Sequence, residues 1–206
     1  MRTITASTGI LMLLCLILPS HAFPQPWQFV KERDGIKLFV RQEANTPFKT
    51  FHGETTFRGN YSLVCSLIGD PARLDWWDDD IRDIRVLAYE KDKLIRYYFV
   101  YDVPWPFTDR DLVAEVKLSG DPLTGPRTVF SKPLLNLVPR YPEMVRVTDF
   151  WQKWTIRPLK DGKVQVTLEG YINPAGDVPA WLYNMVIVDI PLRLLKEIRN
   201  RAGDGG

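Results

Sequence analysis

The feature that most constrains the fold is a rigid, aromatic turn at Pro104–Asp111, with the sequence Pro-Trp-Pro-Phe-Thr-Asp-Arg-Asp. Two prolines fix φ and exclude a helix, so the stretch must be an extended or turning connection. Residues 112–118 then alternate apolar and polar side chains, as a half-buried strand does. Charged residues directly after such a turn more often lock it through ion pairs and hydrogen bonds than perform catalysis. We therefore expect a structural turn that leads into a strand.

The N-terminus has the form of a secretory signal peptide. Arg2 supplies a positive start, and residues 9–18 form an apolar run. Residues 19–22 then place small side chains before a cleavage site that follows Ala22. This apolar run is far shorter than the ~20 residues that a membrane-spanning helix needs. The pattern therefore favours a cleaved signal peptide at 1–22 over an uncleaved anchor.

The remaining residues, 23–206, are enough for one domain with a sizeable core and too few for two. Cys65 is then the only cysteine, so we expect no internal disulfide and a fold held together by its core. A signal peptide implies a periplasmic or secreted protein. Because Asn60–Ser62 fits an N-glycosylation acceptor, secretion from a eukaryotic cell stays open.

Charge and motifs exclude several classes of protein. The net charge of +2 is too small for a strongly basic nucleic-acid binder, so we expect no nucleic-acid partner. The sequence has no Gly-x-Ser-x-Gly elbow, no His-Glu-x-x-His helix and no Cys-x-x-Cys pair. The acidic cluster at 75–80 lacks the alternation and the glycine of a calcium loop. We predict no catalytic residues, no metal and no cofactor.

Periodicity predicts an α+β protein. Alternating side chains and turn signals predict strands at 36–41, 48–57, 81–89, 94–101, 111–119, 126–131, 143–157 and 163–172. Asn60 or Ser62 can cap a short helix that runs through Ile68. A long helix is predicted at 180–201, kinked at Pro191. Its apolar stripe consists of Trp181, Met185, Val188, Leu192 and Leu195. This order describes a curved antiparallel sheet wrapped around a long C-terminal helix.

The turn resembles the Pro-Trp-Pro-Phe-x-x-Arg-Asp signature of START domains, the lipid-transfer modules related to steroidogenic acute regulatory protein. Residues 170–184 resemble the Asp-Pro-Gly-Gly-x-Ile-Pro-x-Trp-Leu-x-Asn stretch that leads into the C-terminal helix of bacterial START-like proteins. Asn173, Ala175 and Val178 depart conservatively from that stretch. Further similarities come at 144–158, which resembles the family's paired strands, and in the tryptophans at 76 and 77. Together the matches follow the family order over the whole mature chain.

The resemblance implies a helix-grip fold with one internal cavity for one hydrophobic molecule, usually a sterol or a lipid tail, under a mobile lid. Strand parity and the helix stripe then give the candidate ligand-binding residues: Tyr97, Phe99, Tyr101, Leu112, Ala114, Val116, Arg146, Trp154, Ile156, Val166, Leu168, Trp181, Met185, Val188 and Leu192. Each of them fits a packed core equally well. Some sterol-carrying relatives place a buried arginine on the strand after the Arg-Asp pair. Here those positions are apolar, so a sterol anchor requires Arg146 to turn inward.

These expectations combine into an exported lipid-binding or lipid-transfer protein that is not an enzyme. It would hold one phospholipid, sterol-like or other lipid as a monomer, with transient membrane contact during exchange. Cations near the end of the last helix fit either contact with anionic headgroups or simple compensation of the helix dipole. One alternative is a cyclase- or hydratase-like enzyme of the same superfamily, using polar groups such as Tyr97, Arg146 or Glu169. Another is an envelope interaction module whose cavity is filled by side chains.

Overall fold

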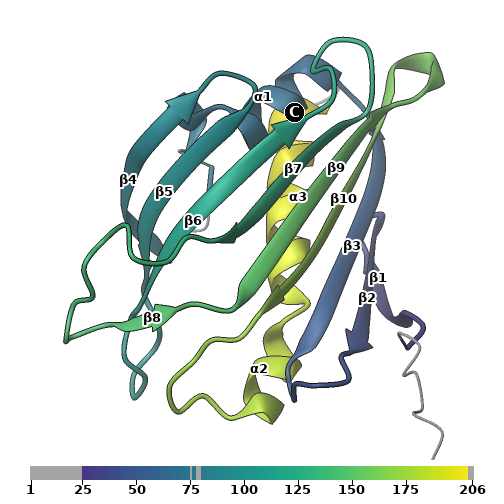
Figure 1. Cartoon of the computed structure of the whole chain (residues 1–206). Helices are drawn as coiled ribbons and strands as arrows, with labels where there is room; N and C mark the ends of the chain where they lie inside the picture. The colour runs from purple at the N-terminus through teal and green to yellow at the C-terminus, as the bar shows by residue number, and fades with distance from the viewer. Residues whose placement is uncertain (1–24, 75, 78–79, 204–206) are drawn as a thin grey trace, which may run out of the picture.

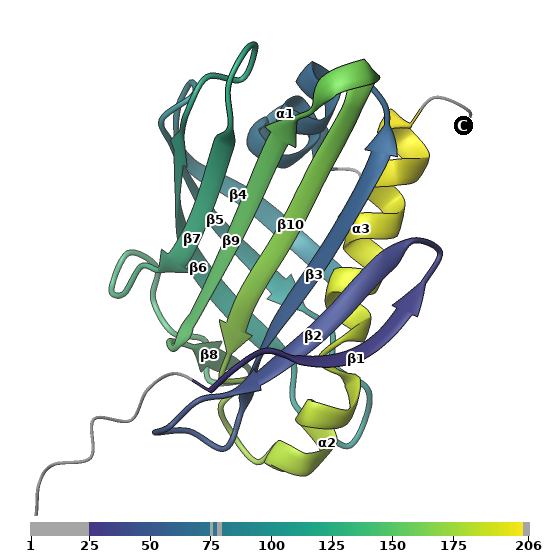
Figure 2. The ribbon, with the colours of Figure 1, turned by 90° about the vertical axis from the view of Figure 1, so that its right-hand side faces the viewer.

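The computed structural model describes residues 25–74, 76–77 and 80–203. Within them, ten strands form one sheet in the order β1-β2-β3-β10-β9-β7-β6-β5-β4, and β8 pairs with β6. The strands are β1 (Gln28–Arg33), β2 (Ile36–Gln42), β3 (Lys49–Arg58), β4 (Ile81–Glu90), β5 (Leu94–Tyr101), β6 (Arg110–Ser119), β7 (Arg127–Pro133), β8 (Val145–Val147), β9 (Phe150–Pro158) and β10 (Lys163–Ile172). The sheet curves around the C-terminal helix, which confirms the predicted helix-grip architecture (Figures 1 and 2).

The helices lie on the concave side of the sheet and at its ends. They are α1 (Tyr61–Gly69), α2 (Ala180–Val186) and α3 (Asp189–Ala202), with short 3-10 turns at η1 (Pro71–Arg73) and η2 (Lys160–Gly162). Asn60 caps α1 by accepting a hydrogen bond from the backbone N–H of Leu63, as predicted. Figures 1 and 2 place α1 and the last turns of α3 at one end of the molecule and α2 at the other.

The close approach of α3 to the sheet requires a glycine on β3. A Cβ atom at Gly53 would come within 2.8 Å of both Leu195 Cδ1 and Pro191 Cβ. Real Cβ atoms do not approach other carbons so closely, so only glycine allows the backbone of β3 to lie beneath α3. This contact fixes α3 over the half of the sheet that contains β2, β3 and β10.

The predicted strand at 143–157 is wrong, because the chain breaks it into β8 and β9. β8 pairs in parallel with β6, whereas β9 pairs antiparallel with β7 and β10. Asp149 lies at the break, where its carboxylate accepts a hydrogen bond from the Tyr171 hydroxyl at 3.1 Å. The alternation in this stretch therefore came from two strands with different partners. β1 is a further strand, one that the sequence reasoning missed.

The predicted C-terminal helix is two helices, which changes the buried stripe. α2 ends at Val186, and α3 begins at Asp189. Pro191 lies in the first turn of α3, and the kink predicted there appears as the break at Ile187 and Val188. A proline cannot donate to the carbonyl four residues before it, here that of Ile187, and its missing N–H costs α3 no hydrogen bond of its own. Trp181 and Met185 are therefore 69% and 63% exposed, and the prediction that they face the interior is wrong. The buried stripe runs through Tyr183, Ile187, Val188, Leu192, Leu195 and Ile198.

The predicted signal peptide at 1–22 lies outside the described residues, as do Asp75, Asp78 and Asp79 of the acidic cluster. Among the helices of the described part of the chain, none has the length and apolar character to cross a membrane.

Candidate functional site

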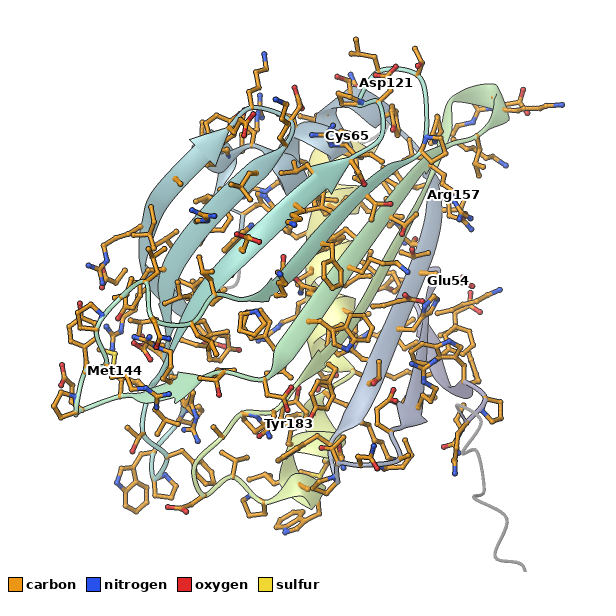
Figure 3. The ribbon with its side chains drawn as sticks, in the orientation of Figure 1. Glu54, Cys65, Asp121, Met144, Arg157 and Tyr183 are labelled. Atoms are coloured by element: carbon orange, nitrogen blue, oxygen red, sulfur yellow. The ribbon has the colours of Figure 1, made fainter. Side chains whose placement is uncertain are left out.

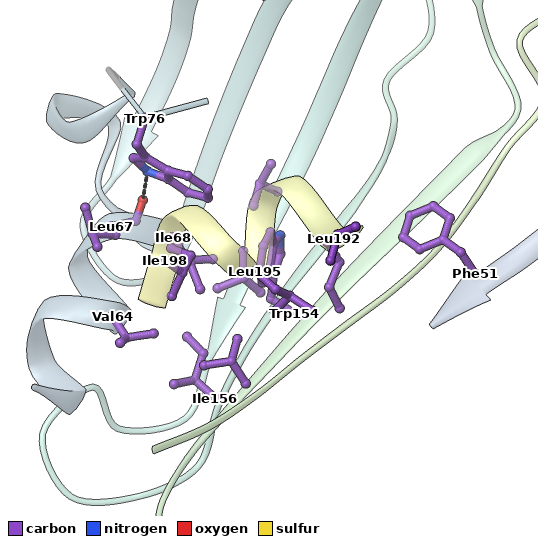
Figure 4. Close-up of a cluster of buried hydrophobic side chains, with 14 of the residues drawn as sticks. Phe51, Val64, Leu67, Ile68, Trp76, Trp154, Ile156, Leu192, Leu195 and Ile198 are labelled. Atoms are coloured by element: carbon purple, nitrogen blue, oxygen red, sulfur yellow. Dashed lines mark hydrogen bonds between the residues drawn. The ribbon is translucent and has the colours of Figure 1, made fainter. Parts of the chain in front are cut away.

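The interior between the sheet and α3 is one continuous apolar cluster. Most of the candidate ligand-binding side chains are buried in it: Tyr97, Leu112, Ala114, Val116, Trp154, Ile156, Val166, Leu168, Val188 and Leu192. Phe99 and Tyr101 are half-buried and pack against it. The inward parity predicted for these strands is confirmed, and their contact with a ligand stays a prediction. Figure 4 shows side chains of this cluster, with Trp154 beside Leu195 and Leu192 of α3.

Arg146 does not reach this interior, so the expectation that it could anchor a ligand there is wrong. Its guanidinium forms a buried bidentate ion pair with Asp111 at 2.7 and 2.8 Å. It also donates to the carbonyl oxygens of Val138 and Pro139, at 3.1 and 2.9 Å. Asp111 holds the pKa of Arg146 above its usual value through these hydrogen bonds. The pair fixes the 134–144 loop against the convex face of the sheet, where a second small core surrounds Tyr98.

The end of the interior nearest α2 is built from loops that are tied to one another. We call it the α2 end: α2 together with the loops 43–48, 102–109 and 173–179. Asn184 on α2 donates to the carbonyl of Pro47 and accepts from the backbone N–H of Lys49, both at 2.9 Å. Arg110, 5% exposed, donates to the carbonyls of Pro174 and Ala175 at 3.2 Å. Arg110 also donates to the carbonyl of Thr108, so its side chain joins the 102–109 loop to the 173–179 loop.

Large apolar side chains are exposed at the α2 end. Trp105, whose peptide bond to Pro106 is cis, is 91% exposed at the tip of the predicted rigid turn. On α2, Trp181, Met185 and Val186 are 69%, 63% and 45% exposed. Exposed side chains of this size on neighbouring elements indicate a contact surface.

Tyr183 on α2 is the one residue at this end whose polar group is buried without a partner among the described residues. The side chain is 9% exposed, and its hydroxyl oxygen is buried and makes no hydrogen bond. Its ring meets Phe48 edge-on, with centroids 5.4 Å apart. Burial raises the pKa of Tyr183, so the hydroxyl stays protonated. Figure 3 shows Tyr183 at the α2 end, far from Cys65. The sequence reasoning missed it, because it placed the buried stripe on the neighbouring helix face.

The opposite end, which we call the α1 end, comprises α1, η1, Trp76 and the last turns of α3. Trp76 donates to the carbonyl of Leu67 at 2.8 Å and meets Trp154 edge-on, with centroids 6.1 Å apart (Figure 4). The carbonyl of Ala202 accepts from the backbone N–H of Asn60 at 2.9 Å, which ties α3 to the start of α1. This end is closed by packing.

The convex face of the sheet carries a polar hollow that does not open into the interior. It has a volume of about 260 Å³, and its lining includes His52, Glu54, Lys153 and Glu169. The Glu169 carboxylate lies 3.1 Å from His52 Nδ1 and 3.0 Å from Lys153 Nζ. The contact with His52 and, to a smaller extent, the contact with Lys153 lower the pKa of Glu169 to about 2 despite its partial burial. Glu169 therefore cannot serve as a catalytic group inside the interior, and Arg146 cannot either.

His52 and Cys65 lie on opposite sides of the sheet, so they do not form a nucleophilic couple. His52 packs against Phe39 and Trp27 on the convex face, whereas Cys65 is buried in the interior cluster. Burial raises the pKa of the Cys65 thiol, as expected for a packed apolar position. Within the part of the chain that the structure describes, no three His, Cys, Asp or Glu side chains are arranged to hold a metal ion.

The cations of the last helix are engaged within the protein. Arg193 contacts Asp80 at 3.5 Å and the Tyr101 hydroxyl at 3.4 Å. Lys196 pairs with Asp34 at 3.5 Å, and Arg201 pairs with Glu197 at 2.6 Å. This arrangement gives them a structural role and weakens the prediction that they contact a membrane.

Known proteins are similar to this chain in sequence and in fold. An uncharacterized protein of Pseudomonas aeruginosa is 27% identical over 184 residues, or 88% of this chain and 89% of its own length. The phosphatidylcholine transfer protein of Rattus norvegicus is 28% identical over 170 residues, or 77% of this chain and 75% of its own. A STAR-related lipid transfer protein of Xanthomonas axonopodis superposes with a TM-score of 0.75 at 28% identity, covering 85% of this chain and 97% of that one. No family model matches the sequence.

Proposed function

Because the chain is a START-type domain with the helix-grip fold, we propose that it binds one lipid molecule in its apolar interior and transfers it between membranes. The names of the rat and Xanthomonas relatives support this class of function. The observation that carries the proposal is the α2 end, where exposed Trp105, Trp181 and Met185 lie beside the apolar interior. Burial of a lipid tail contributes about 0.8 kcal/mol per methylene, so affinity needs no catalytic group.

The lipid enters by displacement of α2. Buried side chains line the interior as one continuous cluster, so a ligand must separate elements that pack against one another. α2 has seven residues, lies between the 173–179 loop and a break before α3, and exposes three large apolar side chains. Segments with few buried contacts open at low free-energy cost. The α1 end, in contrast, would stay closed during exchange.

Membrane contact occurs through the same end. Trp side chains prefer the interface between headgroups and acyl chains, where a large apolar ring and an N–H group are both accommodated. Trp105 lies in the 102–109 loop and Trp181 lies on α2, directly after the 173–179 loop. Arg110 joins these two loops. When α2 is displaced in this arrangement, the interior opens toward the bilayer, and the lipid enters without passing through water.

We place this carrier outside the cytoplasm, in a periplasm or as a secreted protein, on the basis of the sequence at 1–22. A carrier is favoured over an enzyme, because two of the polar groups considered for catalysis lie outside the interior: Arg146 pairs with Asp111, and Glu169 pairs with His52 and Lys153. The lipid is a phospholipid, a sterol-like molecule or another lipid, bound by a monomer.

Native mass spectrometry of residues 23–206 from the host compartment, followed by organic extraction, tests the binding function. We expect a one-to-one adduct that extracts as a lipid. A protein that carries nothing and also ignores added phospholipid and sterol vesicles would overturn the proposal and favour the side-chain-filled interaction module.

A vesicle-flotation assay tests the membrane contact. The double variant Trp105→Ala/Trp181→Ala should bind phospholipid vesicles at least about tenfold more weakly, because two interfacial anchors are lost. Leu123→Ala is the matched control: Leu123 is 72% exposed, on the β6–β7 loop that contacts α1 through Tyr61. Equal losses in the control and the double variant would contradict docking through the α2 end.

A further inference from the structure

Buried tyrosine hydroxyls normally have a hydrogen-bond partner, because an unsatisfied polar group in an apolar environment is costly. Tyr183 departs from this rule among the described residues, with a side chain 9% exposed and an unpaired hydroxyl. Its ring is held in place by Phe48. The position is therefore fixed by packing, while the polar atom of the side chain remains unused within the protein.

The groups around Tyr183 divide the site into an apolar and a polar side. Directly after α2, Ile187 and Val188 are 0% and 6% exposed and belong to the apolar cluster. On the polar side, the Tyr171 hydroxyl is engaged by Thr46 Oγ1 at 3.0 Å and Asp149 Oδ2 at 3.1 Å. The Tyr101 hydroxyl interacts with Asp80 at 3.3 Å. Tyr183 thus stands at the boundary between the apolar interior and the polar end of the molecule.

We propose that the Tyr183 hydroxyl donates a hydrogen bond to a carbonyl oxygen of a bound acyl lipid. This inference rests on the proposed lipid-binding function and names the chemical group that the site selects. In an acyl lipid, the ester or amide carbonyl lies where the apolar tail ends, which matches the boundary position of Tyr183. The hydroxyl would then gain the partner that the protein itself does not supply.

A neutral acceptor fits this site better than a phosphate group. Moving a charged phosphate into an apolar environment costs far more than one neutral hydroxyl can return. The nearby guanidiniums are committed elsewhere, since Arg110 binds three backbone carbonyls and Arg193 contacts Asp80. A phosphate-containing headgroup would therefore remain outside, toward solvent or the membrane.

The experiment compares two probes, a diacyl phosphatidylcholine and its dialkyl ether analogue with the same chain length, which differ in their carbonyl groups. The wild-type protein should bind the diacyl lipid about 2- to 10-fold more tightly, the range expected from one neutral hydrogen bond. Tyr183→Phe keeps the ring beside Phe48 and should abolish this preference while binding the ether lipid as well as the wild type does. Tyr171→Phe is the control, and it should retain the preference.

The outcomes separate the two proposals. If the wild-type protein binds neither lipid, the lipid-binding function fails and this inference with it. If it binds both but shows no ester preference, or if Tyr183→Phe retains that preference, only the hydrogen bond fails. An equal loss of both lipids in Tyr183→Phe would assign the side chain a packing role and would also overturn the inference. Should the variant not fold, the absence of an ester preference in the wild-type protein would still overturn the inference.

Discussion

The α1 end and the α2 end close the same apolar interior in different ways. At the α1 end, Trp76 and its neighbour Trp154 on β9 are 4% and 5% exposed, and the Trp76 indole N–H has a backbone partner. At the α2 end, Trp105 and Trp181 are largely exposed, and the buried hydroxyl of Tyr183 is unpaired among the described residues. The same residue types are thus used for packing at one end and are presented to the surroundings at the other.

This difference indicates that the α1 end contributes to stability and that the α2 end is available to a partner. An end with fully packed aromatic side chains contributes to the free energy of unfolding, and it resists opening. An end with exposed aromatic side chains and an unsatisfied polar group contributes less to stability, and it retains interactions for a partner. The proposed carrier would therefore open at the α2 end and keep its fold through the α1 end.

The largest difference in stability is expected when one tryptophan near each end is replaced by alanine. Trp154→Ala should lower the free energy of unfolding by about 3–5 kcal/mol, because it leaves a cavity beside Trp76. Trp181→Ala should change it by less than about 0.5 kcal/mol, because the side chain is already 69% exposed. Urea unfolding of both variants measures the difference. Similar losses would erase the distinction between the ends.

The loops of the α2 end depend on Arg110. Arg110→Ala should lower the free energy of unfolding by about 2–3 kcal/mol, because three backbone carbonyls lose a charged donor. Hydrogen exchange should become faster in the loops 102–109 and 173–179 and remain unchanged in α1. Faster exchange at the α1 end as well would show that the two ends unfold as one unit.

Replacement of Tyr171 on β10 and replacement of Tyr183 on α2 should affect stability differently. Tyr171→Phe removes a hydroxyl that contacts Thr46 and Asp149, and it should lower the free energy of unfolding by about 1 kcal/mol. Tyr183→Phe removes an unpaired hydroxyl and should leave the stability of the ligand-free protein unchanged or slightly higher. Thermal unfolding of the delipidated variants gives both values. A clear loss in Tyr183→Phe would mean that its hydroxyl has a partner within the folded protein.

The smallest effect is a pH response confined to the α2 end. The pKa of Asp109 is held below its ordinary value of 3.8, first by the hydrogen bond from the Val103 backbone N–H and also by the ion pair with Arg82. A lowered pKa contributes stability that is present above pH 3.8 and is lost as the pH falls below it. After correction for intrinsic rates, exchange in the 102–109 loop should therefore accelerate between pH 5 and pH 3. Asp109→Asn should remove the pH dependence, and an unchanged response would exclude Asp109 as its cause.

Local patterns predicted most of the elements. Alternation gave the strands at 36–41, 94–101 and 163–172 nearly residue for residue, because one face of each is buried. The cap at Asn60 followed from the preference of short polar side chains for helix starts. Where the pattern failed, a long-range partner decided the outcome: pairing of β8 with β6 broke the strand predicted at 143–157.

The candidate site was predicted less completely than the fold. Parity correctly placed Leu112, Ala114 and Val116 in the interior, because successive strand residues alternate between the two faces. Arg146 was assigned to the wrong face, since its partner Asp111 is 35 residues away and no local signal links them. The buried hydroxyl of Tyr183 was missed for a similar reason. A helix break between α2 and α3 changes which residues face inward, and apolar spacing alone does not show the break.

The sequence by itself determined the turn that precedes β6, most of the strands and the family resemblance, because proline geometry, side-chain alternation and local motifs act over a few residues. Only the tertiary structure decided that the aromatic side chains would be buried at the α1 end and exposed at the α2 end. Exposure depends on which distant elements cover a side chain, and these contacts form when the sheet closes around α3. The chemistry that we assign to Tyr183 belongs to this second class.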